Sequence, residues 1–375
     1  MANVMDYIKW RGDLLFSQDS PNAVDTLIFS IISYLHFDGH VLREPLRPIP
    51  LREAAEEFLT LEDIDKRIRA KNDLELLKLA AQTVRFGDTQ ICCYQDLLIP
   101  YQDTQFAAMT FLLDDGSMCV AFRGTDNTLV GWKEDFNMCF QQTIPAQRLA
   151  QQYIRDISLE FSRPMRLCGH SKGGNLAVFA AARSAPAIQK RMLSIYNHDG
   201  PGFSDYLMGD PGYLAMVPKI HTFVPQSSLI GMIMDHEEDY TIVKSKQVSI
   251  LQHDPFSWEI MGKQLVPMKE LTADSRFFNR TIKNWLAGMT YEERNQMVDV
   301  LFDLLSTGNV DEASEIFRLK NIRNYIRAMV GGNNSTRKVL TEDFVGLLEA
   351  ARQAHTELEQ QRLEQKKEEE NTTPT

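Results

Sequence analysis

Residues 165–182 read MRLCGHSKGGNLAVFAAA and contain the pattern G-x-S-x-G over Gly169–Gly173. A short apolar run precedes the pattern and a segment rich in small residues follows it. This context predicts a sharp strand-to-helix turn, a nucleophile elbow, with Ser171 at its tip. The turn would expose the Ser171 hydroxyl at the carboxyl edge of a sheet, above the positive end of a helix. A purely structural glycine-rich turn is the alternative.

Strands and helices are expected on both sides of this stretch. Short runs rich in β-branched, aromatic and sulfur-bearing residues predict strands at 89–95, 105–113 and 117–124. Further on, helical patterns at 145–162 and 172–184 alternate with expected strands at Met165–Cys168, Met192–Asn197, Lys219–Val224 and Val248–Gln252. Such alternation predicts an α/β protein with a mostly parallel sheet and helices on both faces.

The rest of the chain is expected to be helical or disordered. Helical spacing at 22–38 and 51–84 makes residues 1–88 a mainly helical part of one large domain spanning 1–285. The strands then stop, and residues 286–355 are expected to form a C-terminal helical extension. The charged tail at 356–375 has no apolar face and is expected to be a frayed helix or, as its composition favours, a disordered segment.

Composition narrows the class of protein. The 375 residues carry 40 Lys and Arg against 51 Asp and Glu, a net charge of −11, which argues against nucleic-acid binding. No apolar run reaches the ~18 residues of a membrane-spanning helix, and the charged N-terminal segment does not fit a signal peptide. Five cysteines without C-x-x-C spacing suit a reducing compartment. We therefore expect a cytoplasmic protein without metal or cofactor.

Acyl transfer at Ser171 would need donors for an oxyanion. One is expected to be the backbone N–H of Lys172, which follows the nucleophile. The other is expected from the segment Phe122–Asp126, where Gly124 lets the chain turn so that the amide of Thr125, with or without its hydroxyl, points into the cleft. The alternative is a tight turn in which Thr125 and Asp126 cap the next helix.

The catalytic base is expected to be a histidine that follows the nucleophile in the chain. His253 comes directly after the last expected strand, which is where the base should lie, and we favour it. His236, in a charged loop, is the second choice. His221 falls inside an expected strand and is interpreted as a core residue, and His355 lies in the C-terminal extension.

The acid is expected between the nucleophile and the base in the chain. Asp199 follows the strand Met192–Asn197 and satisfies the order Ser171, Asp199, His253. Its alternative is a turn-forming role before Gly-Pro-Gly. Asp235 and Asp254 remain open as acids.

Four segments together resemble a known family: 122–126 (FRGTD), 169–177 (GHSKGGNLA), 199–203 (DGPGF) and 252–258 (QHDPFSW). They are similar to an uncharacterised bacterial α/β-hydrolase family called Mbeg-like, itself distantly similar to the class-three, fungal-type lipases. The resemblance spans about residues 3–285. It implies an α/β-hydrolase fold with Ser171 as nucleophile, Thr125 as oxyanion residue and His253 as base. Where the lipases carry their acid, after the penultimate strand, this chain has Ser227 and Ser228.

These expectations lead to three hypotheses. The first is a serine hydrolase that cleaves a small-molecule carboxylic ester through an acyl-enzyme on Ser171. The second is a thioesterase, amidase or acyltransferase of the same fold, and the third is a non-catalytic interaction protein. The apolar segment Leu229–Met234 is interpreted as a lid or acyl-binding wall, or as core. The natural substrate and oligomeric state do not follow from the sequence.

Overall fold

The computed structural model describes residues 2–37, 47–126, 129–138, 141–204, 206–290, 292–294, 296, 346 and 349–360. The chain divides into two compact units, Met1–Leu271 and Thr272–Thr375. The domain boundaries expected at residues 285 and 355 stay predictions. The helices expected over 297–345 and the tail beyond residue 360 lie outside the described residues.

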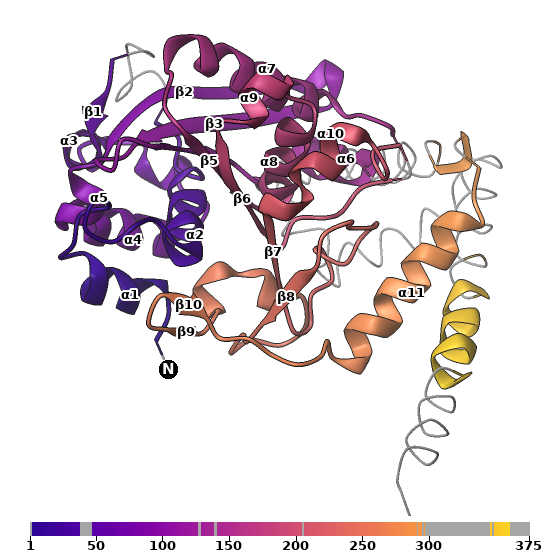
Figure 1. The fold of residues 1–375 in the computed structure, drawn as a ribbon. Coiled ribbons are helices and arrows are strands. Elements are labelled where there is room, and N and C mark those ends of the chain that lie inside the picture. Colours follow the sequence, from indigo (N-terminus) through magenta and orange to yellow (C-terminus); the bar gives the residue numbers. More distant parts are fainter. Residues whose placement is uncertain are drawn as a thin grey trace, which may run out of the picture. The chain divides into compact units, whose positions relative to one another are not determined.

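The first unit is built on a sheet that has eight strands in the described residues, paired in the order in which they occur in the chain (Figure 1). The strands are β1 (Ile49–Pro50), β2 (Gln90–Ile99), β3 (Thr104–Leu112), β4 (Met118–Phe122), β5 (Met165–His170), β6 (Met192–His198), β7 (Ile220–Pro225) and β8 (Tyr240–Val243). Strands β1 to β4 pair antiparallel. From β4 to β8 every pair is parallel, so these strands end at one edge of the sheet.

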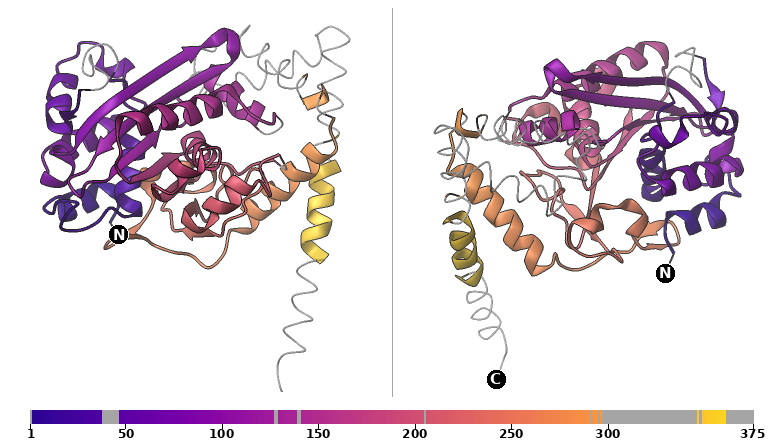
Figure 2. Two further views of the ribbon diagram at one scale, coloured as in Figure 1. Left: turned by 45° about the horizontal axis from the view of Figure 1, so that its top comes forward. Right: turned by 180° about the vertical axis from the view of Figure 1, so that it is seen from behind.

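The helices that connect the parallel strands gather on one face of the sheet (Figures 1 and 2). Sequential strand order and right-handed crossovers place successive connections on the same side. Here α8 packs between α7 and α10, and Leu176 of α8 joins one core cluster with Val120 and Ile195 of the sheet. The helices of this part are α6 (Leu129–Met138), α7 (Pro145–Glu160), α8 (Lys172–Ala182), α9 (Pro186–Gln189) and α10 (Pro211–Met216).

The N-terminal helices cover the opposite face. They are α1 (Val4–Arg11), α2 (Ala23–Ile32), α3 (Leu51–Phe58), α4 (Lys71–Ala81) and α5 (Val84–Gly87). Helix α2 is buried over Val24–Ile32 and packs on β4 and β5. The predicted α/β-hydrolase fold is confirmed, with one face covered by the N-terminal helices and the other by crossovers.

One expected strand is wrong. The run Val248–Gln252 is not in the sheet: residues Ser249–His253 form a 3₁₀ turn, η4, and the eighth strand is instead β8. The side chains of Val248, Ile250 and Leu251 are exposed, so the apolar run is not a core strand. The remaining short elements of this unit are η1 (Ile64–Lys66), η2 (Pro100–Gln102), η3 (Val217–Lys219), η5 (Pro255–Ser257), β9 (Ile260–Met261) and β10 (Gln264–Leu265).

The second unit contains α11 (Ala273–Ala287) and a helical segment at 349–360. An ion pair joins Arg280 to Glu357 within it. None of the helices in the described residues has the length and apolar character needed to cross a membrane.

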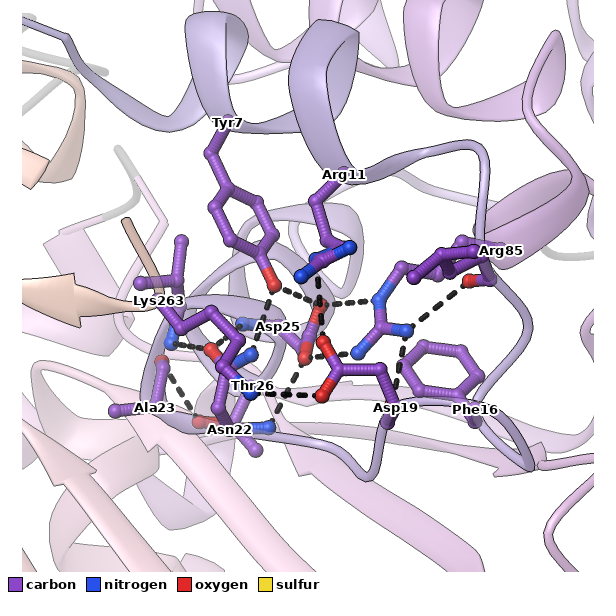
Figure 3. A network of polar contacts seen from close by, with 12 residues as sticks. Tyr7, Arg11, Phe16, Asp19, Asn22, Ala23, Asp25, Thr26, Arg85 and Lys263 are labelled. Atoms are coloured by element: carbon purple, nitrogen blue, oxygen red, sulfur yellow. Dashed lines mark hydrogen bonds and ion pairs between the residues drawn. The ribbon is translucent and has the colours of Figure 1, made fainter. Parts of the chain in front are cut away.

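A buried ion pair ties the N-terminal helices together (Figure 3). Arg85 donates to both carboxylate oxygens of Asp25, at 2.8 Å from Nε and 2.6 Å from Nη2, and neither side chain is exposed. Tyr7 and the backbone of Asn22 also donate to Asp25. Arg85 lies over the ring of Phe16 at 4.0 Å. The pair therefore links α2 to α5 and to the loop after α1.

Substituting Arg85→Met is expected to lower the free energy of unfolding by about 3–5 kcal/mol, because it leaves a buried carboxylate without its cation. Lys263→Met is the control, since Lys263 is half exposed in its pair with Asp19 and is expected to cost under about 1 kcal/mol. Urea denaturation of both variants measures the difference. Equal losses of stability in the two variants would contradict the stabilising role of the Arg85–Asp25 pair.

Candidate active site

Ser171 lies at a strained turn between β5 and α8. Its backbone has φ 59° and ψ −135°, a conformation that residues other than glycine rarely adopt. Gly169 and Gly173 permit this turn: a Cβ on Gly169 would lie 2.1 Å from the carbonyl carbon of Gly173. A Cβ on Gly173 would lie 2.1 Å from the carbonyl oxygen of Phe122 in β4. The G-x-S-x-G spacing therefore has a direct steric cause, the close approach of the first turn of α8 to β5 and to β4.

The elbow is held by backbone hydrogen bonds at the carboxyl edge of the sheet. The N–H of Ser171 donates to the carbonyl of His198 at 2.9 Å, and the Ser171 carbonyl accepts from Gly174 at 2.9 Å. Ser171 is the N-cap of the eleven-residue α8, so it lies at the positive end of that helix.

Asp199 and His253 are brought together. Asp199 follows β6 directly, is fully buried, and also has a positive φ, of 56°. Its Oδ2 accepts from Nδ1 of His253 at 2.6 Å, and the His253 side chain is 24% exposed. The other oxygen, Oδ1, accepts from the hydroxyl of Ser228 at 2.5 Å and from the N–H of Gly231 at 3.2 Å. Asp199 thus has three donors, one of which is the imidazole.

The other acid and base candidates lie elsewhere. Asp254 caps η5, with Oδ1 accepting from the N–H of Phe256 at 3.1 Å. Asp235 is exposed and its backbone pairs with Phe203. Both ring nitrogens of His236 have partners, Glu238 and the carbonyl of Gly231. Of these carboxylates, only Asp199 pairs with His253.

His253 is fixed against the elbow by its neighbour His170. The carbonyl of His253 accepts from Nε2 of His170 at 2.8 Å, and the two rings lie 4.5 Å apart. Tyr34 of the N-terminal part donates to Nδ1 of His170 at 3.0 Å. Burial, with His253 alongside, holds the pKa of His170 well below its usual value, so this ring is neutral.

Ser171 and His253 share no hydrogen bond between side chains in the part of the chain that the structure describes. In sites without substrate such bonds are often long and shorten when substrate binds.

The segment expected to form the oxyanion loop follows β4, whose last residue, Phe122, pairs with Gly169 of the elbow. The hydroxyl of Thr125 donates to Asp135 of α6, so of the two donors expected of Thr125 the backbone N–H is the one that remains a candidate for an oxyanion. Burial raises the pKa of Asp135 to about 6. Residue 124 has no room for a side chain, since a Cβ on Gly124 would lie 2.1 Å from the Tyr34 hydroxyl.

Lys172 has a buried side chain whose role no motif in the sequence predicts. Its Nζ donates to the backbone and side-chain carbonyls of Gln105, both at 2.8 Å, and to Glu134 at 2.9 Å. Glu134 also accepts from the N–H of Gln105 and of Ala146. This network joins the first residue of α8 to β3, α6 and α7, and so fixes the Lys172 amide that is expected to face an oxyanion.

The supporting residues Tyr34, His170, Ser228 and Glu134 were not predicted to act at the site. They lie on separate elements, and no motif links a tyrosine after α2 to a histidine 136 residues further along the chain. Among the described residues, no group of three or more His, Cys, Asp or Glu is arranged to hold a metal ion.

Comparisons with solved structures find lipases. M37 lipase has 13% sequence identity and a TM-score of 0.39, over 57% of this chain and 70% of that one. A mutant of MDLA from Penicillium cyclopium has 12% identity and a TM-score of 0.35, over 66% and 86%. The Rhizomucor miehei lipase propeptide complex has 12% identity and a TM-score of 0.32, over 47% and 70%. At these identities the likeness concerns the fold alone.

No curated protein matches the chain. A family profile described as Mbeg1-like matches residues 80–303, which is more than half of the chain. The match includes the elbow, Thr125, Asp199 and His253. The chain belongs to the Mbeg1-like family.

Proposed function

We propose that the protein is a serine hydrolase that cleaves carboxylic esters through an acyl-enzyme on Ser171. The observation that carries the proposal is the 2.6 Å hydrogen bond between Asp199 and His253, whose loop is fastened to the strained serine turn through His170. A nucleophile, a base and an acid that orients the base are the parts that acyl transfer requires.

In the proposed reaction, Nε2 of His253 takes the proton of the Ser171 hydroxyl as the serine oxygen attacks the ester carbonyl carbon. Asp199 accepts the Nδ1–H bond throughout, which fixes the tautomer and stabilises the imidazolium. The tetrahedral intermediate collapses, the carbon–oxygen bond to the alcohol breaks, and His253 returns the proton to the leaving oxygen. Water, activated by His253, then attacks the acyl-enzyme, releases the carboxylic acid and restores Ser171.

The amides of Lys172 and Thr125 are the proposed donors to the oxyanion. Lys172 begins α8, so its N–H has no carbonyl partner within the helix and lies at the positive helix end. Fixed donors aimed at a developing charge are typically worth about 3–4 kcal/mol each in the transition state.

We propose a neutral ester with an apolar part as the substrate. The segment Leu229–Met234 is half-buried beside the acid, with Gly231 donating to Asp199. Ile250 and Leu251, which precede His253 within η4, have exposed aliphatic side chains. Both surfaces favour apolar ligand groups over charged ones.

Hydrolysis of short-chain aryl esters tests the proposal. We expect steady turnover, preceded by a burst of released phenol if deacylation is slower than acylation. Product analysis with an added alcohol distinguishes a hydrolase, which releases acid, from an acyltransferase, which forms a new ester. A chain that cleaves thioesters or amides but no oxygen ester would overturn the substrate class.

A further inference from the structure

His236 is a buried histidine near the catalytic acid that the mechanism above does not use. It follows the segment Leu229–Met234 in the chain, and its side chain is 5% exposed. Nδ1 lies 3.2 Å from Oε1 of Glu238, and Nε2 lies 2.9 Å from the carbonyl oxygen of Gly231.

Both partners of the ring are hydrogen-bond acceptors. A carbonyl oxygen can only accept, so Nε2 carries a proton. Glu238 receives donors on both oxygens, from Tyr213 on Oε2 at 2.7 Å and from Thr222 on Oε1, which favours the ionised carboxylate. Opposite an ionised carboxylate, Nδ1 donates and so carries a proton as well. A histidine with a proton on each nitrogen is an imidazolium cation.

The electrostatics agree with this geometry. Burial favours the neutral ring, yet the hydrogen bonds to Glu238 and Gly231 raise the pKa of His236 above its usual value. Burial likewise opposes ionisation of Glu238, but its donors, His236 first, lower the pKa of Glu238 to about 2. The groups facing His236 are Glu238, the neighbouring Asp235 and the ring of Tyr240 at 6.4 Å, with Tyr213 behind Glu238.

Gly231 connects this cation to the catalytic acid. Its carbonyl accepts from His236, while its N–H donates to Oδ1 of Asp199 and to the hydroxyl of Ser228, at 3.2 and 3.0 Å. Gly231 lies so close to the acid that an added Cβ would be 2.3 Å from Oδ1 of Asp199. A shift of Gly231 would thus remove donors from Asp199, whose other oxygen holds His253.

We propose that His236 is a positioning residue for the catalytic acid: as an imidazolium clamped by Glu238, it fixes Gly231 so that the Ser228–Gly231 turn donates to Asp199. The inference rests on the proposed function, because Asp199 is an acid only in that reaction. A neutral ring keeps one N–H, and this stays on Nδ1 because the hydrogen bond to the ionised Glu238 is the stronger one; Nε2 therefore loses its proton, and with it the bond that holds Gly231. Activity should therefore fall as the pH rises through the raised pKa of His236, on the alkaline side of the ordinary histidine range.

Two variants test this inference through the pH profile of aryl-ester turnover from about pH 5 to about pH 9. His236→Gln has no titrating ring, so its alkaline fall should disappear, with kcat reduced about 3–10-fold at unchanged KM, a loss of about 1 kcal/mol in the transition state. Glu238→Gln keeps the ring but removes the carboxylate, so its alkaline fall should move to lower pH by about one unit. The acid limb of the profile should stay in place in both variants.

A merely structural role for His236 predicts different data: lower melting temperatures but an alkaline limb at the parent position in both variants, and that result would overturn the inference. Nitrogen NMR of the parent protein distinguishes failure of the inference on His236 from failure of the proposed function. We expect both nitrogens of His236 to stay protonated above pH about 6.5, the ordinary midpoint of histidine, a readout that needs no activity. A neutral His236 would overturn the inference even if the ester is cleaved.

Discussion

Substituting Ser171→Ala is expected to reduce kcat for aryl-ester hydrolysis by about a million-fold, the loss typical of removing the nucleophile from a serine triad. The residual rate would come from the oxyanion donors and from substrate binding, which the substitution leaves in place. The measurement is steady-state hydrolysis beside the parent chain, with circular dichroism to show that the fold persists. Activity within tenfold of the parent would contradict the role of Ser171.

Ser171→Gly adds a second readout at the same position. Glycine tolerates the positive φ that Ser171 adopts, so this variant is expected to be as inactive as Ser171→Ala yet more stable than the parent by about 1 kcal/mol, since backbone strain of this kind costs about 1–3 kcal/mol. Urea denaturation gives the difference. Such opposite changes in stability and activity would show that the elbow is strained for function.

Substituting Asp199→Asn is expected to lower kcat by about 10⁴-fold. Oδ1 of Asp199 accepts from Ser228 and Gly231, so the asparagine must keep its carbonyl oxygen there. Its NH₂ group then faces Nδ1 of His253, in place of the oxygen that accepts the 2.6 Å bond. Two donors cannot share this bond, so the proton of His253 moves to Nε2. The base can then no longer accept the proton of Ser171.

Asp254→Asn is the matched control for Asp199→Asn. Asp254 is next to the base in the chain, but it caps η5, and asparagine caps helices equally well. We expect kcat within about tenfold of the parent and little change in stability. A larger loss in Asp254→Asn than in Asp199→Asn would reassign the acid.

The elbow and the sheet around it could be predicted because their signals are local. The close approach of Gly169 to Gly173 lies within one five-residue pattern, and the runs around β4, β5 and β6 are mostly buried strands. The last part of the sheet could not be predicted in this way. Tyr240–Val243 is a half-exposed edge strand with a weak pattern, whereas the stronger apolar run at 248–252 is largely on the surface.

The reacting groups of the candidate site could be predicted from the sequence, but the residues that hold them in place could not. Chain order directed the choice to Asp199 and His253, which the fold pairs. The contacts that hold this pair come from other elements: Ser228 from the end of β7, Gly231 from the following turn, and Tyr34 from beyond α2. These contacts join residues up to 136 positions apart, and such distances leave no spacing pattern in a single sequence.

The central claim is that Ser171 is an activated nucleophile, and covalent labelling with a fluorophosphonate tests it most directly. The serine oxygen would bond to phosphorus, fluoride would leave, and the proton would pass to His253. Peptide mass spectrometry locates the adduct. We predict a single adduct on Ser171 in the folded protein and its loss on prior denaturation or in His253→Ala. A folded protein that remains unlabelled, or is labelled at another serine, would contradict the account.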